Sequence, residues 1–218
     1  MLKSSATFLA VSGIDPTPYC ACISGLMKRQ PIVVSCTSAV RAKAVPALGI
    51  TNGARDSIAS GPRGGVRGPL ATWLYRPELA ARAQDLGRYC RYDTLLPPPR
   101  LSELAILTMA RHWSAEYEWA AHKKEALKAG LSASVTEAIR TGTQPEYTDE
   151  HIKVVHAVAR SILETSDVSD SLYAAAVAAL GTEKLIDLVG LLGDSTLISM
   201  TLNVFRIPPH EQGRPELS

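Results

Sequence analysis

The chain has 218 residues, of which 23 are basic and 21 acidic, so its formal net charge at pH 7 is only +2. This length suits one domain with a sizeable core and is short for two full domains. The nearly balanced charge argues against nucleic acid as a partner and against a solvated acidic tail.

Residues 1–50 differ in composition from the rest of the chain. They are rich in Ser, Thr and Ala and carry five basic side chains against Asp15 alone. Such a start is typical of a poorly ordered extension or of an organelle transit peptide, and it fits a secretory signal less well because Ser12 and Gly13 interrupt the apolar run. We expect a cytoplasmic protein, or a mitochondrial one if this extension is a transit peptide.

The four cysteines match no metal-binding spacing. Cys20, Cys22 and Cys36 have no histidine nearby, and Cys90 stands alone. We interpret all four as reduced thiols of an intracellular protein and expect neither a metal nor a cofactor.

Residues 51–76 form a segment dense in Gly, Pro, Asn and Ser, which predicts a loop leading into the domain. A glycine-rich turn can hold a phosphate, but that site needs a preceding strand, and no strand-like alternation leads into this loop. Arg63 and Arg67 are therefore interpreted as solubilising charges, with contact to an anion as the alternative.

Residues 77–207 show a period near 3.6 with helix start and stop signals, which predicts an all-α domain of about six to seven helices, followed by a tail over residues 208–218. The helix signals include Pro77, the break at residues 97–99, Gly130 after the third helix, and Ser134 with Glu137 as a capping box. The predicted helices cover 77–92, 101–113, a third segment ending at 129, 134–142, a segment starting at 149, a segment starting at 169, and 182–205.

The last predicted helix is apolar nearly all round and long enough to cross a membrane. Asp187 and Asp194 lie inside it, with Gly190 and Gly193 beside them. Charged residues are costly in a bilayer, so we expect a buried or oligomer-interface helix and no membrane partner.

Three polar residues stand out on apolar helices. Glu118 and His122 lie one turn apart, on the face that carries Ala115 and Trp119. They are either a satisfied core pair or a pair whose pKa values are shifted by burial so that they exchange a proton with a substrate. Glu103 lies in a helix that is apolar on most sides, where a carboxylate needs a partner, and the next helix offers His122.

The segment from Leu101 to Ser132, LSELAILTMARHWSAEYEWAAHKKEALKAGLS, resembles the core motif of the carboxymuconolactone decarboxylase family, to which the alkylhydroperoxidase D proteins also belong. The similarity extends to GPRGGVRGP at 61–69, VSDSLYAAAVAAL at 168–180 and TLISMTLNVFRIP at 196–208. The resemblance implies an alkylhydroperoxidase D-like helical bundle that assembles as a homo-oligomer, either a trimer or a hexamer.

The residues of the motif distinguish two branches of that family. The redox branch has the pattern Glu-x11-Cys-x2-Cys-x3-His, but this chain has Ala115 and Glu118 where the two thiols would stand. Without a thiolate at those positions, disulfide-based peroxidase chemistry is disfavoured. The decarboxylase branch has a Glu-x3-His pair here, which Glu118 and His122 match, while Asp194 stands where relatives often have an aromatic residue.

The resemblance to the decarboxylase branch implies a cofactor-free carboxy-lyase acting on a small carboxylic acid, such as a carboxylated lactone or keto acid. We assign His122 as the general acid, Glu118 as the carboxylate bonded to it, and Glu103 as a relay. Arg111 is a candidate to hold a substrate carboxylate, with a surface ion pair as the alternative, and Tyr117 is a further candidate for the same pocket.

Two other functions stay open. One is a non-catalytic oligomeric helical protein of the same fold, in which Glu118 and His122 are locked together. The other is a thiol-dependent oxidoreductase that uses Cys90 or the N-terminal cysteines.

Overall fold

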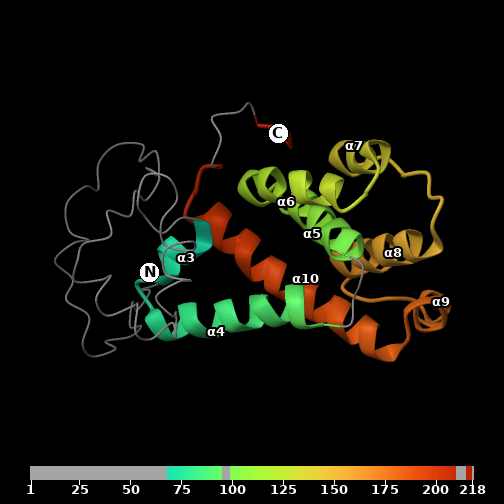
Figure 1. The fold of residues 1–218 in the computed structure, drawn as a ribbon, viewed down its shortest axis with the longest axis horizontal. Helices are drawn as coiled ribbons and strands as arrows, with labels where there is room; N and C mark the ends of the chain where they lie inside the picture. The colour runs from blue at the N-terminus through green and yellow to red at the C-terminus, as the bar shows by residue number, and fades with distance from the viewer. Residues whose placement is uncertain (1–67, 95–98, 210–214, 218) are drawn as a thin grey trace, which may run out of the picture. The chain divides into compact units, whose positions relative to one another are not determined.

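The computed structural model describes residues 68–94, 99–209 and 215–217, and it confirms an all-α fold. The described residues form eight α-helices and one π-helix and contain no strand (Figure 1). The expectations for residues 1–50, for Arg63 and Arg67, and for the three N-terminal cysteines lie outside the described residues. The helices are α3 (Gly68–Trp73), α4 (Pro77–Arg88), the π-helix η1 (Tyr89–Asp93), α5 (Pro99–His112), α6 (Glu116–Lys128), α7 (Ala133–Thr141), α8 (Glu150–Thr165), α9 (Asp170–Leu180) and α10 (Thr182–Val204).

Helix α5 is the central helix of the core. Every residue from Leu101 to Ala110 is buried, because α6, α8 and α10 pack against it on different sides (Figure 1). This enclosure explains why α5 is apolar on nearly all faces rather than along one stripe. It also places Glu103 in the interior, where 5% of the residue is exposed.

The capping signals predicted the starts of α8 and α9 correctly. Asp149 caps α8 by accepting hydrogen bonds from the backbone N–H groups of His151 and Ile152, and Ser169 caps α9. The capping box predicted from Ser134 and Glu137 is wrong. The residue that caps α7 is Ser132, because its backbone is extended and its hydroxyl oxygen reaches the N–H of Val135 at 3.2 Å.

The segment predicted as a loop over residues 51–76 contains a helix, so that prediction is wrong for α3. Trp73 closes α3 and donates from its indole Nε1 to Oγ1 of Thr201 on α10 at 3.1 Å. Gly68 opens α3 with a φ of +64°, and a Cβ there would come within 2.8 Å of the Tyr117 hydroxyl. Both contacts of α3 come from helices that are distant in the sequence, so the local composition of residues 51–76 does not predict this helix.

The described part of the predicted C-terminal tail returns to the core. Leu217 is buried among the core residues, and Oε2 of Glu216 accepts a hydrogen bond from Nε1 of Trp119 at 3.0 Å. Residues 215–217 thus cover one side of α6.

Helix α10 combines a buried face with an exposed apolar one. Among the described residues it is the helix long and apolar enough to cross a membrane, and half of that segment is buried within the fold, as in a core helix. The opposite face carries an exposed row of apolar residues at helical spacing, here called the α10 stripe: Ile186, Val189, Met200 and Val204.

Candidate functional site

Six polar side chains from four helices interact inside the bundle, and together they are called the acid–base cluster here. Their elements are η1, α5, α6 and α10; α6 and α10 pack against α5, and η1 packs against α10. The members are Arg91, Glu103, Glu118, His122, Asp194 and Ser199.

His122 is bonded to Glu103. The imidazole Nδ1 lies 2.7 Å from Oε2 of Glu103, and 14% of the His122 side chain is exposed. A carboxylate only accepts hydrogen bonds, so Nδ1 is the donor in this bond, and Nε2 is the ring nitrogen that does not face Glu103. The pairing of Glu103 with the next helix, inferred from its enclosure, is therefore confirmed.

Glu118 is bonded to Ser199 and not to His122, so the predicted hydrogen bond between Glu118 and His122 is wrong. The hydroxyl of Ser199 on α10 donates to Oε2 of Glu118. Residues four apart share a face of a helix, but here Glu118 turns toward α10 while His122 turns toward α5. The sequence spacing predicts the shared face and does not identify the partner of each side chain.

Burial raises the pKa of Glu118 to about 8, the main cause being the loss of hydration around a side chain of which almost nothing is exposed. The Ser199 hydrogen bond and the charge of Arg91 oppose this rise, and the negative charges of Asp194 and Glu103 add to it. Glu118 is consequently neutral in most molecules at pH 7.

Asp194 is a further buried carboxylate of the cluster. Burial raises its pKa to about 6, and the positive charge of Arg91 limits the rise. Its Oδ1 has no hydrogen-bond partner within the described residues. A Cβ at Gly87 would stand 3.2 Å from its Oδ2, so glycine allows α4 to approach this carboxylate closely.

Sequence reasoning missed Arg91, which supplies the positive charge of the cluster. It donates to Oε1 of Glu103 at 3.3 Å, and 31% of its side chain is exposed. Arg91 lies in the π-helix η1, which continues α4 where the sequence predicts an ordinary helix to residue 92. Single π-helical turns occur often at functional sites, but side-chain periodicity over five residues gives no signal for one.

Cys90 is a poor candidate for a reactive thiol. It is 2% exposed, and burial, together with the charges of Asp194 and Asp187, raises its pKa. A thiol must ionise to act as a nucleophile, so this environment argues against thiol chemistry at Cys90. The other three cysteines lie outside the described residues.

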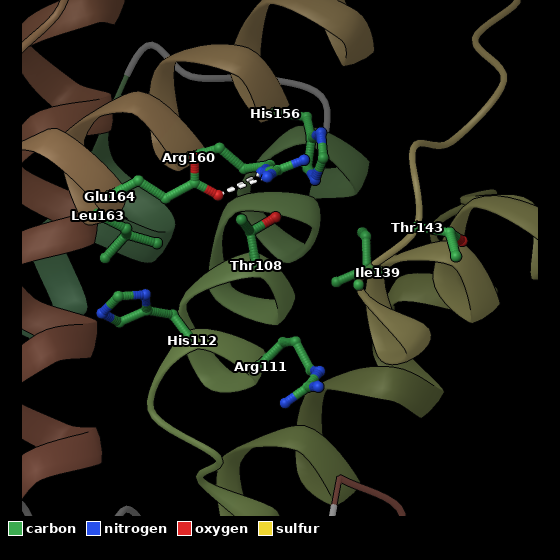
Figure 2. A pocket seen from close by; sticks show the side chains of 10 residues that line it. Thr108, Arg111, His112, Ile139, Thr143, His156, Arg160, Leu163 and Glu164 are labelled. Atoms are coloured by element: carbon green, nitrogen blue, oxygen red, sulfur yellow. Dashed lines mark hydrogen bonds and ion pairs between the residues drawn. The ribbon is translucent and has the colours of Figure 1, made fainter.

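The structure does not bring Arg111 to the acid–base cluster. Arg111 instead lines a pocket of about 270 Å³ between α5, α7 and α8, called the α5–α8 pocket here (Figure 2). Glu103, Glu118 and His122 are not among the residues that line this pocket. Tyr117 extends toward Gly68 at the start of α3.

Comparisons with known proteins leave the family of the chain open. No protein-family model and no curated protein sequence matches it. The resemblance to carboxymuconolactone decarboxylases thus stays a prediction from the motif. Within the described part of the chain, no group of three or more His, Cys, Asp and Glu side chains is arranged to hold a metal ion.

Proposed function

We propose that the protein is a cofactor-free carboxy-lyase of the carboxymuconolactone decarboxylase type, with the acid–base cluster as its active site. The observation that carries this proposal is the 2.7 Å bond between Nδ1 of His122 and Oε2 of Glu103. A carboxylate on one ring nitrogen fixes the tautomer and stabilises the imidazolium, which prepares the other nitrogen to transfer a proton.

The proposed substrate is a small lactone or keto acid whose carboxylate lies β to a carbonyl group or its vinylogue. The carbon–carbon bond to the carboxylate breaks, carbon dioxide leaves, and the electron pair enters the conjugated enolate. Nε2 of protonated His122 gives its proton to the substrate carbon, and water then returns a proton to the ring. The substrate itself holds the electron pair, so the step needs no cofactor.

Arg91 is the residue we assign to the substrate carboxylate, in place of Arg111. Its side chain is partly exposed, and it already contacts Glu103, the partner of His122. A guanidinium has five N–H donors, so a contact to Glu103 leaves others for a second carboxylate. Neutral Glu118 supports this role, because it adds no negative charge beside an anionic substrate.

The α10 stripe supports assembly as a homo-oligomer, which the resemblance implies to be a trimer or a hexamer. Exposed apolar residues grouped on a surface can mark an interaction site, and the stripe consists of two such groups, Ile186 with Val189 and Met200 with Val204. The same stripe favours the second candidate, a non-catalytic oligomeric protein in which the acid–base cluster only holds α5, α6 and α10 together.

The two candidates differ in one measurement. Full-length protein is incubated at pH 7 with a panel of carboxylated lactones, including gamma-carboxymuconolactone, and β-keto acids, while evolved carbon dioxide is recorded. The carboxy-lyase is expected to release carbon dioxide from at least one acid above the buffer rate. Release from none of them would contradict the proposal and favour the non-catalytic candidate.

A further inference from the structure

The α5–α8 pocket takes no part in the proposed reaction, yet it gathers basic side chains. It has a volume of about 270 Å³. Arg160 and His156 on α8, and Arg111 and His112 in the last turn of α5, line it; Figure 2 shows Arg111 and His112 pointing to opposite sides of α5. Such a volume suits a small molecule or ion rather than a large cofactor.

Arg111 has a buried donor without an acceptor. Its Nε is buried and makes no hydrogen bond, and within the described residues the Arg111 side chain forms no ion pair. Buried donors in folded proteins nearly always have a partner, so this Nε is a candidate to bind a water molecule or an anion. A guanidinium fits the planar fork of a carboxylate or the oxygens of a phosphate.

The charges at the pocket favour an anion over a cation. Arg160 adds a second guanidinium, and the carboxylate that lines the pocket, Glu164, is bonded to Nε of Arg160 at 2.8 Å. His156 is neutral at pH 7, because burial and the nearby Arg160 lower its pKa to about 4. The pocket is therefore lined by two guanidinium groups and by one carboxylate, which is already bonded to Arg160.

The remaining walls suit a small anion with a short hydrocarbon part. Ile139 and Leu163 line the pocket as apolar walls, and the Thr108 hydroxyl donates to the carbonyl of Leu104 at 2.8 Å. That hydroxyl retains the capacity to accept a hydrogen bond.

A basic residue in the last turn of a helix also interacts favourably with the helix dipole. That role would account for the charge of Arg111 at the end of α5. It does not account for the buried Nε without an acceptor, a feature that Arg111 shares with Arg100; unlike Arg100, which is paired with Asp149, Arg111 has no ion pair within the described residues.

We propose that the α5–α8 pocket binds a small oxyanion, either a carboxylate or a phosphate, through Arg111 as the main partner and Arg160 as the second. This site is separate from the acid–base cluster and does not depend on the proposed carboxy-lyase activity.

The proposal is tested by calorimetric titration of the full-length protein with inorganic phosphate and, separately, with succinate at low ionic strength. At least one of the two is expected to bind, and the stronger one identifies the source of the anion. Arg111→Gln is expected to weaken that binding about tenfold or more, since a charge-assisted bond is lost. Glu164→Gln, which releases Arg160, is expected to tighten it.

Arg82→Gln is the matched control, because Arg82 is exposed on α4 and carries the same charge. It is expected to change binding by about twofold at most. A variant that removes the carboxylate partner of the other site, Arg91→Gln, is expected to bind the anion like the wild type. If Arg111→Gln does not fold, Arg160→Gln provides the same comparison. Absence of binding for both anions, or equal losses in the Arg111 and Arg82 variants, would overturn the proposal.

Discussion

Ser199 donates a hydrogen bond to Glu118 from a helix 81 residues further along the chain, and this contact joins α6 to α10 in the interior. The bond is one of the few polar interactions that a nearly inaccessible carboxyl group makes. Burial holds Glu118 in its neutral form at pH 7, with a pKa of about 8, although the bond from Ser199 opposes this rise. The protonation of one buried side chain couples the stability of this interface to pH.

The first prediction concerns that coupling. Glu118 has a pKa of about 8 in the folded protein against an ordinary value of 4.5, so the folded state binds a proton that the unfolded state has lost. Its contribution to the free energy of unfolding is present below pH 4.5 and is lost as the pH rises through 8. The loss is expected to reach a few kcal/mol.

The interval from pH 6.5 to 8 isolates this contribution. Asp194 acts in the same direction but titrates around 6, and His156, with its pKa lowered from 6.5 to about 4, acts in the opposite direction below 6.5. Urea unfolding at several pH values in this interval is expected to show falling stability for the wild type and little change for Glu118→Gln. Glu146→Gln, at an exposed site, is the control. A wild-type curve that is flat in this interval would contradict the assignment.

The sequence predicted the elements of this fold better than the partners of its polar residues. Asp149 and Ser169 predicted helix starts correctly because capping depends on atoms three residues apart. The partner of Glu103 was predictable because an enclosed carboxylate needs one, and the next helix offered a single histidine. Ser199 and Arg91 were not predictable, since their contacts depend on how α10 and η1 pack against α5 and α6.

The second prediction concerns the bond between His122 and Glu103. Glu103→Gln keeps the shape of the side chain but removes the charge that stabilises the imidazolium. Turnover is expected to fall about 100- to 10,000-fold in His122→Gln and by a similar factor in Glu103→Gln. The assay is carbon dioxide release, and it is combined with nitrogen NMR of the imidazole, in which Glu103→Gln is expected to disturb the tautomer of His122.

His151→Gln is the control for the second prediction, because that side chain is 55% exposed at the start of α8. It is expected to turn over substrate like the wild type. Full turnover in both His122→Gln and Glu103→Gln would mean that the hydrogen bond between these residues stabilises the helical bundle and has no role in catalysis.

The third prediction compares two helical glycines. Alanine at Gly87 would place a Cβ 3.2 Å from Oδ2 of Asp194, which is 2% exposed and has little room to move. At Gly193 a Cβ would have no neighbour within 4 Å. Gly193→Ala is expected to raise the free energy of unfolding of the single chain by about 0.5 to 1 kcal/mol through helix propensity; it is measured at a concentration where the α10 stripe, whose face includes Gly193, is unpaired.

Gly87→Ala gains the same propensity, but the contact with Asp194 is expected to reverse its sign and lower the stability by about 1 kcal/mol or more. Thermal and urea unfolding measure both variants under one condition. Stabilisation of equal size at the two positions would mean that α4 does not need glycine for its approach to α10.

The fourth prediction concerns the α10 stripe. Val189 is 52% exposed in the single chain and lies between apolar neighbours on one face of α10. If that face is buried between subunits, an aspartate there would put an unpaired charge into an apolar contact, which costs several kcal/mol. Val189→Asp is expected to convert the oligomer to single chains, measured as mass by light scattering.

Leu127→Asp on α6, also at an exposed apolar residue but outside the stripe, is expected to leave the mass unchanged. A wild-type mass equal to one chain would contradict assembly of the protein through any surface. Equal dissociation by Val189→Asp and Leu127→Asp would mean that the α10 stripe is not the specific contact between subunits.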